Sequence, residues 1–283
     1  MTYQANIQDA ATIVVLNCAF SWGNVTDKQL TEEAVSTNGA VRGALRVRKT
    51  LLPEESGKHV RNVQHELGKF YNGFHNMHTY STPIVGQRIM PTAFYMDYMK
   101  AYSETNDKGK EALAELKAAY PDSIEQARKL LGDSFKRDDY PDVDEIDRYY
   151  KFDVLFLPVP VGSNIMNALG ASVAANVDEY VGTVLKTAAE DAKKRLRDAV
   201  QLMAERLTTK GSKIYDSMPQ AINELAHSLP AIAGLAGDPE LTSLVQEVKA
   251  TLSGYNGDDF RDNPANRTVV GAAATALLKK MGG

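Results

Sequence analysis

The first half of the chain alternates between strand-like and helix-like apolar patterns. The apolar, β-branched run Ala11–Trp22 is too short for a lone helix and predicts a strand. Two more strands are predicted at Ile84–Met90 and Lys151–Val161. The second belongs at a sheet edge or end, because Pro158 and Pro160 lack the N–H that a strand ladder requires. Apolar spacing and capping residues predict helices at Lys28–Ser36, Lys58–His78, Ala93–Ser103, Lys108–Tyr120, Asp122–Phe135 and Val143–Tyr149.

From Ser163 onward the pattern is almost entirely helical. One apolar stripe recurs at helical spacing through Val177, Val181, Val184, Ala188, Ala192, Leu196, Ala199, Met203 and Leu207. It predicts a single long helix whose narrow stripe suits a helix hairpin or a coiled-coil seam. Further helices are predicted at Pro219–Ser228, Pro239–Leu252 and Thr268–Met281, with loops at Gly234–Asp238 and Gly254–Asp258.

These patterns predict an α+β fold. A small antiparallel sheet with packed helices is followed by a mainly helical C-terminal part that contains one long helix. The composition changes around Gly162–Gly170. We therefore expect a mixed α/β domain with a cationic strand over residues 1–162 and a helical region over 163–283.

The stretch Val41–Leu51 concentrates positive charge near the front of the chain. If it is a strand, its side chains alternate between two faces. One face then carries Arg42, Arg46 and Arg48, and the other carries Val41, Leu45, Val47 and Leu51. A helix stays open as the alternative, because helical spacing also fits Val41, Ala44, Leu45, Arg48 and Leu52.

Charge is distributed unevenly along the protein. The 283 residues are 43% hydrophobic and carry a net charge of −4, which allows a sizeable core and argues against a polycation that coats nucleic acid along its whole length. From Arg42 to Lys69, seven basic residues outnumber three acidic ones, whereas from Ser103 to Asp147 thirteen acidic residues outnumber seven basic ones. A local basic patch can still bind nucleic acid, because the local field steers the ligand.

The basic front segment is a candidate nucleic-acid interface. Guanidinium groups bind phosphate bidentately and stay charged, and aromatic rings offer faces on which bases stack. The predicted binding residues are Trp22, Arg42, Arg46, Arg48, Lys49, Arg61 and Arg88, and Lys58 and Lys69 would extend the cationic track; Phe20, Tyr71 and Phe74 are further stacking candidates. The alternative is that the arginines pair with nearby acidic helices and the aromatic residues belong to the core.

The sequence carries only weak signals for a metal site or a catalytic site. His75 and His78 lie three residues apart on one predicted helix face, but no third metal ligand stands at a defined spacing. The acidic cluster Asp138–Asp147 is crowded into one loop and helix start, where a helix dipole explains it. No phosphate-binding loop, dinucleotide fingerprint or nucleophile elbow is present. We expect no cofactor, no metal and no catalytic activity.

Cysteine content and hydropathy suggest the compartment. Cys18 is the only cysteine, so no disulfide can form within the chain, and a reducing compartment fits. The first residues lack the basic region of a signal peptide, and no apolar stretch approaches the ~20 residues of a membrane span. An intracellular protein that does not enter a membrane is expected.

A resemblance covers nearly the whole chain. It is carried by Trp22, Asp27, Glu32-Glu33, Arg48–Pro53, Gly86–Pro91, Tyr95, Tyr98-Met99, Tyr120, Ala127, Leu131-Gly132, Phe135, Asp139–Pro141, Phe152, Pro158–Pro160, Met203–Leu207, Asp238–Leu241 and Leu278–Met281. These segments are similar to a family of hypothetical proteins of tailed bacteriophages whose activity is unsettled. The resemblance implies a protein made in the host cytoplasm, from a DNA-metabolism part of a phage genome.

Three classes of function follow as hypotheses. The leading one is a non-catalytic phage protein of DNA replication or recombination that binds single-stranded DNA. Its helical half would mediate homo-oligomer formation or contact with phage or host replication proteins. The alternative is a structural or adaptor protein that docks a partner through its long helix and has no nucleic-acid role. A metal-dependent nuclease is kept as a third class, because of the clustered acids and histidines.

Overall fold

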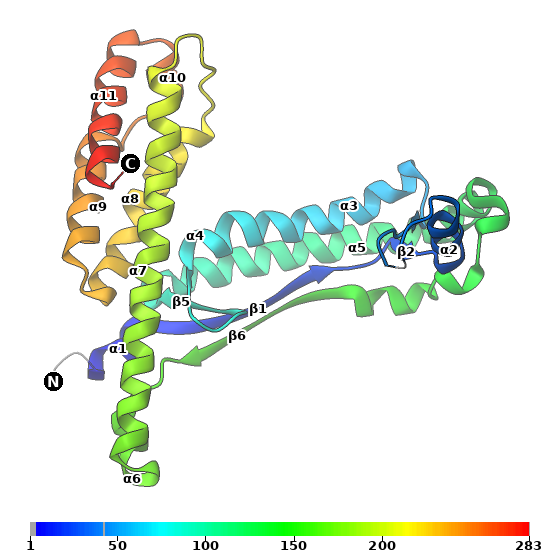
Figure 1. The fold of residues 1–283 in the computed structure, drawn as a ribbon, viewed down its shortest axis with the longest axis horizontal. Coiled ribbons are helices and arrows are strands. Elements are labelled where there is room, and N and C mark those ends of the chain that lie inside the picture. The colour runs from blue at the N-terminus through cyan, green and yellow to red at the C-terminus, as the bar shows by residue number, and fades with distance from the viewer. Residues whose placement is uncertain (1–3, 42, 283) are drawn as a thin grey trace. The chain divides into compact units, whose positions relative to one another are not determined.

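The computed structural model describes residues 4–41 and 43–282 and confirms the predicted α+β fold (Figure 1). The strands are β1 (Ala11–Phe20), β2 (Asn24–Thr26), β3 (Arg48–Thr50), β4 (Tyr80–Ser81), β5 (Gln87–Pro91) and β6 (Tyr150–Pro158). The α-helices are α1 (Gln4–Ala10), α2 (Lys28–Thr37), α3 (Glu54–Lys69), α4 (Asn76–His78), α5 (Tyr95–Leu131), α6 (Gly162–Leu169), α7 (Ala171–Thr208), α8 (Ser217–Ala236), α9 (Pro239–Thr251), α10 (Asp258–Arg261) and α11 (Pro264–Lys280). Shorter helical turns are η1 (Phe70–His75, a π-helix) and the 3-10 turns η2 (Thr92–Phe94), η3 (Gly132–Ser134), η4 (Arg137–Asp139) and η5 (Val143–Tyr149).

The chain forms two compact units. Unit 1 comprises residues 1–16, 74–98 and 154–283, and unit 2 comprises residues 17–73 and 99–153. The divisions fall inside β1, η1, α5 and β6. The predicted boundary after residue 162, between a mixed α/β domain and a helical region, stays a prediction.

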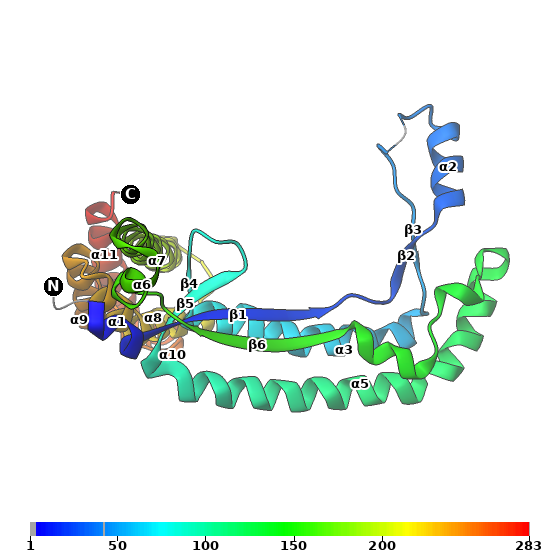
Figure 2. The same ribbon diagram turned by 90° about the horizontal axis from the view of Figure 1, so that it is seen from below.

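Four strands form one sheet in the order β4-β5-β1-β6 (Figure 2). β5 pairs antiparallel with β1, with Ala11 opposite Pro91 and Val15 opposite Gln87, and β4 pairs antiparallel with β5. The edge position predicted for the proline-bearing strand is confirmed, because β6 is an outer strand. The strand predicted at Ile84–Met90 begins only at Gln87, since the preceding residues form the turn from β4.

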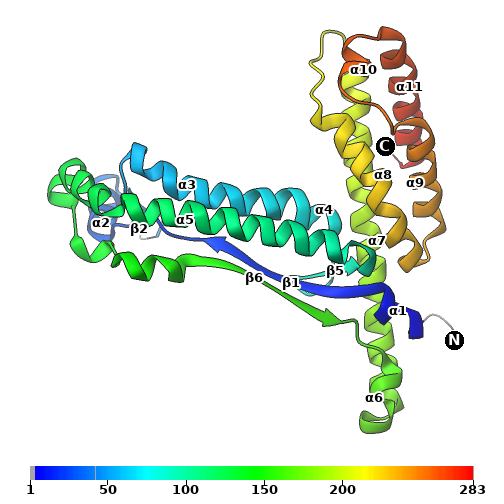
Figure 3. The same cartoon turned by 180° about the vertical axis from the view of Figure 1, so that it is seen from behind.

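The helical part of unit 1 is built around α7. Helices α8, α9 and α11 pack against α7, and α9 also packs against α8 and α11 (Figures 1 and 3). The predicted long helix is confirmed, and its stripe is buried at Val184, Ala188, Ala192, Leu196, Met203 and Leu207. Val177, Val181 and Ala199, which the same pattern includes, are half-buried. α8 continues through Pro230 to Ala236, so the loop predicted from Gly234 begins later.

A polar network fastens β4 to α7 within unit 1. Asp191 accepts hydrogen bonds from the backbone and the hydroxyl of Ser81, at 2.8 and 2.9 Å, and from Arg195 at 2.6 Å. Arg88 and Arg195 both donate to the carbonyl of Thr79, at 2.7 and 3.0 Å. Burial raises the pKa of Asp191, but the bonds from Arg195 and Ser81 outweigh it and hold this pKa below its usual range. The carboxylate therefore stays charged between two guanidinium groups.

Helices α3 and α5 lie side by side in unit 2 (Figure 3), where Ser56 bonds to Gln126 at 3.4 Å. α5 is one continuous helix, so the prediction of three separate helices between residues 93 and 135 is wrong. Pro121 removes one backbone donor. The helix continues because Tyr120 is buried and its hydroxyl donates to the carbonyl of Pro141 at 2.8 Å. The helix predicted at Val143–Tyr149 spans the same residues as a 3-10 turn.

Candidate nucleic-acid interface

A two-stranded ribbon in unit 2 carries the arginine stretch. β2 and β3 pair antiparallel, with Asn24 opposite Thr50 and Thr26 opposite Arg48. Directly opposed residues share a face, and alternate residues along a strand do too. Asn24, Thr26, Arg48 and Thr50 therefore project from one face of the ribbon, and all four are exposed. The Thr50 hydroxyl donates to Asn24 Oδ1 at 3.3 Å across the pair.

The predicted strand Val41–Leu51 is only partly correct. β3 has three residues because its partner β2 has three, and Gly43 adopts a φ of +93°, which is not an extended conformation. From Leu45 to Leu51 the expected alternation still holds, with Arg46 and Arg48 exposed and Leu51 buried. Val41 is 79% exposed, so its predicted core position is wrong.

Lys49 faces the opposite side of the ribbon and is buried. Its ammonium lies 2.5 Å from the carboxylate of Asp139 and 3.5 Å from that of Asp27, and it donates to the carbonyl of Ser134 at 2.9 Å. The backbone N–H of Leu30, which Asp27 caps at the start of α2, holds the pKa of Asp27 below its usual range. Lys49 is therefore a structural cation, and its predicted role as a phosphate ligand is wrong.

Trp22 is a core residue. Only 6% of it is exposed, and its ring centroid lies 5.4 Å from that of Tyr120 and 6.5 Å from that of Tyr149. The indole Nε1 is buried and has no hydrogen-bond acceptor among the described residues. The expectation that Trp22 offers a free face to DNA bases is wrong. Phe20 is buried as well.

The other predicted cations divide into three groups. Arg46, Arg48 and Arg61 are exposed in unit 2, and within the described part of the chain none of them has an ion-pair partner. Arg88 belongs to unit 1, where it is engaged with Thr79 and lies 3.6 Å from Asp191, so the structure does not group it with them. Arg42 lies outside the described residues.

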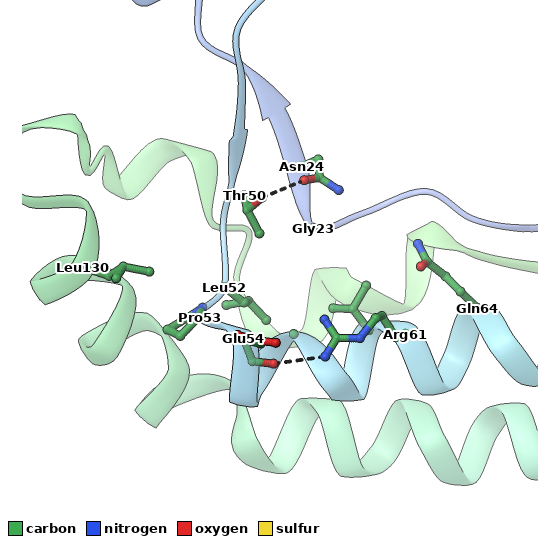
Figure 4. Close-up of a pocket in the computed structure, with 11 residues that line it drawn as sticks. Gly23, Asn24, Thr50, Leu52, Pro53, Glu54, Arg61, Gln64 and Leu130 are labelled. Carbon is green, nitrogen blue, oxygen red and sulfur yellow. Dashed lines mark hydrogen bonds between the residues drawn. The ribbon is translucent and has the colours of Figure 1, made fainter.

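Two hollows border the ribbon within unit 2. The first, called the α3 pocket, has a volume of about 550 Å³ (Figure 4). Asn24 and Thr50 on the ribbon face Arg61 and Gln64 on α3 across it, and Leu130 of α5 borders it (Figure 4). The second, called the α2 groove, has a volume of about 670 Å³; it is lined by Thr26, Lys28, Thr31, Glu32, Val35, Ser36, Gly43, Leu45 and Arg46.

The exposed ribbon face joins the two hollows, because Asn24 and Thr50 line the first and Thr26 lines the second. We call the combined surface the cationic face; it comprises Lys28, Arg46, Arg48 and Arg61 with Asn24, Thr26 and Thr50 between them. Lys28, Arg46 and Arg61 line the two hollows together with two acidic residues, Glu32 and Glu54, and Arg48 lies on the ribbon between them. Guanidinium groups without an acidic partner, set beside hydroxyl and amide groups, suit binding of phosphate and sugar oxygens.

The other titratable candidates have structural surroundings. His75 Nδ1 lies 2.7 Å from the hydroxyl of Tyr98, and the ring of His78 stacks on Phe74 with centroids 4.1 Å apart. Burial raises the pKa of the Cys18 thiol to about 11, so it is protonated at neutral pH. In the acidic segment, Asp142 and Glu145 form a capping box at the start of η5.

Among the described residues, no group of three or more His, Cys, Asp or Glu side chains is placed to hold a metal ion. None of the helices in the described ranges is long and apolar enough to cross a membrane.

Comparisons of the chain with protein-family models, with curated proteins and with solved structures find no match. The resemblance to proteins of tailed bacteriophages therefore stays an expectation. The candidate site rests on the geometry of the cationic face.

Sequence reasoning missed the uncharged part of this face. Asn24, Thr26, Thr50 and Gln64 carry no charge and no motif, and they become neighbours only through the pairing of β2 with β3 and the placement of α3. The signal that could have found them is the run after Gly23, where two exposed polar residues alternate with Val25 as in a short strand.

Proposed function

We propose that this protein is a non-catalytic binding protein for single-stranded DNA, which it holds through the sugar–phosphate backbone along the cationic face. The observation that supports the proposal is that Arg46, Arg48 and Arg61 are exposed on the ribbon and at the two hollows that border it, without acidic partners among the described residues. A surface of this kind attracts a polyanion although the whole chain is acidic.

Binding of this type reads the backbone more than the base sequence. Because Trp22 is buried, no exposed tryptophan adds a stacking platform. Phosphate contacts position a strand but carry no sequence information. The protein should therefore bind oligonucleotides of different sequence with similar affinity. The resemblance to phage proteins adds the expectation of a role in DNA replication or recombination in the host cytoplasm.

Charge reversal on the ribbon tests the proposal. In the variant Arg46→Glu/Arg48→Glu, two exposed cations become acidic and their electrostatic attraction for phosphate is lost. We expect affinity for a labelled oligothymidine, measured by fluorescence anisotropy, to fall at least about tenfold, which corresponds to ~1.4 kcal/mol. The matched control is Lys186→Glu/Arg206→Glu, which makes the same charge change at exposed positions of α7. Equal loss in both variants, or no loss in the first, would contradict a localised site.

An adaptor function is the second candidate, and a specific feature of unit 1 favours it. No charged residue occurs between Asp153 and Asp178, and within this segment Met166 and Val173 are exposed on α6 and the start of α7. Uncharged exposed surface is typical of the centre of a protein interface. The test is to measure the molar mass of Met166→Lys and of the unmodified protein by light scattering. A smaller assembly in the variant would support contact between protein chains through α6 and the start of α7, and assemblies of equal size would contradict it.

A further inference from the structure

The α3 pocket combines an apolar floor with polar side chains. Its floor is apolar and buried at Leu52 and Val60, and its volume is about 550 Å³. Pro53 and Leu130 extend the apolar lining, and Leu130 is 66% exposed although it is a large aliphatic residue. Polar side chains stand at the rim (Figure 4). An apolar hollow with a few placed polar groups is typical of small-ligand sites.

The polar groups at the rim keep free donors and acceptors. Gln64 donates from Nε2 to the carbonyl of Phe20 at 3.1 Å, which leaves its Oε1 to accept. Asn24 accepts from Thr50 through Oδ1, which leaves its amide N–H groups to donate. Arg61 donates from one nitrogen to the carbonyl of Glu54 at 3.2 Å and retains further donors. Asparagine, glutamine and arginine side chains are the groups that hydrogen-bond base edges in protein–nucleic-acid complexes.

We propose that the α3 pocket takes one unpaired nucleobase of the strand that lies on the cationic face. This inference rests on the proposed function and deepens it. The planar base lies over Leu52 and Val60 with its edge toward Asn24 and Gln64, and the guanidinium of Arg61 lies at the rim. The neighbouring phosphates reach Arg48 and Arg46. A paired base has its edge occupied and cannot leave the duplex without cost. The pocket therefore makes the protein selective for single strands, a property that the arginines alone do not supply.

Two glycines on α3 provide a matched pair of variants. Gly57 lines the pocket at an ordinary helical position, where an added Cβ would lie 3.3 Å from the end of the flexible Arg61 side chain. Gly57→Leu should therefore fill the pocket and leave Arg46 and Arg48 in place. Gly68 lies on the same helix outside the pocket, and a Cβ there meets only Asn72 at 3.9 Å. Gly68→Leu makes the same change in helix propensity, so it controls for effects on α3 itself.

The experiment compares three probes by fluorescence anisotropy: an oligothymidine, an abasic strand of the same length and a duplex. The unmodified protein and Gly68→Leu should bind the oligothymidine about tenfold more tightly than the abasic strand, which corresponds to ~1.4 kcal/mol. Gly57→Leu should bind both strands equally, and it should lose the preference of the unmodified protein for the oligothymidine over the duplex. If Gly57→Leu still discriminates between the two strands as Gly68→Leu does, the pocket does not hold a base.

Further variants separate this inference from the proposed function. If Arg46→Glu/Arg48→Glu abolishes binding while Gly57→Leu behaves like the control, the function stands and the base pocket falls. If no variant and no probe shows binding, both fall. Gln64→Leu keeps the side-chain size, removes the hydrogen-bonding edge and leaves the glycines intact, so it tests the pocket independently should Gly57→Leu fold poorly. Gln64→Leu should also lose discrimination between oligothymidine and the abasic strand.

Discussion

At the scale of single residues, contacts with distant parts of the chain decide which side chains of unit 2 are buried and which can bind a ligand. Trp22 is covered by Tyr120 and Tyr149, and Lys49 is covered where it meets Asp139. These partners lie roughly a hundred residues further along the chain, so no local pattern reveals the burial. Arg46 and Arg48 stay exposed because no such partner reaches them among the described residues.

Trp22 gives a direct test of the core around it. As the only tryptophan it reports on one place, and a buried indole emits at shorter wavelength than an exposed one. We expect blue-shifted fluorescence that an added oligothymidine does not quench. Trp22→Ala should lower the free energy of unfolding by ~3–5 kcal/mol, as large aromatic truncations do in cores, with Trp22→Phe milder. Quenching by DNA together with an unchanged unfolding midpoint in Trp22→Ala would show that the ring is exposed.

His75 makes the stability of unit 1 depend on pH. Burial, and then the positive charges of Arg88 and Arg195, lower its pKa to about 4 in the folded state. In the unfolded chain the pKa is ~6.5, so the unfolded state binds more protons in between. Stability should therefore fall as pH drops from about 6.5 toward 4. Thermal midpoints of His75→Gln should decline less over this range than those of the unmodified protein. Parallel declines would contradict a buried neutral histidine.

At the scale of elements, the long helix α7 acts as the packing axis of unit 1. Leu196 is fully buried in its stripe, whereas the neighbouring Arg197 is exposed. Leu196→Asp places an unpaired charge in an apolar site and should lower the free energy of unfolding by about 3 kcal/mol. Arg197→Asp should cost under ~1 kcal/mol. Urea unfolding of the two variants measures the difference, and equal midpoints would mean that the stripe faces another direction.

Elements with regular apolar spacing could be predicted from the sequence. Elements whose length depends on tertiary contacts could not. The strand from Ala11, the helix after Asp27 and the stripe of α7 follow directly from apolar spacing and capping. The sequence suggests breaks before Lys108 and at Pro121, yet α5 passes through both. The reason is that packing of Tyr120 outweighs the single donor lost at the proline.

At the scale of the whole molecule, the fold class could be predicted from the sequence, but the cationic face could not. The cationic face draws on β2, β3, α2 and α3, so it exists only after the ribbon pairs and α3 takes its place in unit 2. The sequence placed Arg88 and Lys49 on this track because a one-dimensional charge pattern does not record which cations meet an aspartate. The net charge of −4 also hides the face, since it averages over the chain.

The salt dependence of DNA binding tests the central claim most directly. Affinity of the unmodified protein for an oligothymidine should fall linearly on a plot of log K against log salt concentration. If Arg46 and Arg48 each contact one phosphate, Arg46→Ala/Arg48→Ala should make that slope shallower by about 1.4. Lys186→Ala/Arg206→Ala should leave the slope unchanged. Binding that is insensitive to salt, or the same slope in both variants, would contradict a phosphate-binding cationic face.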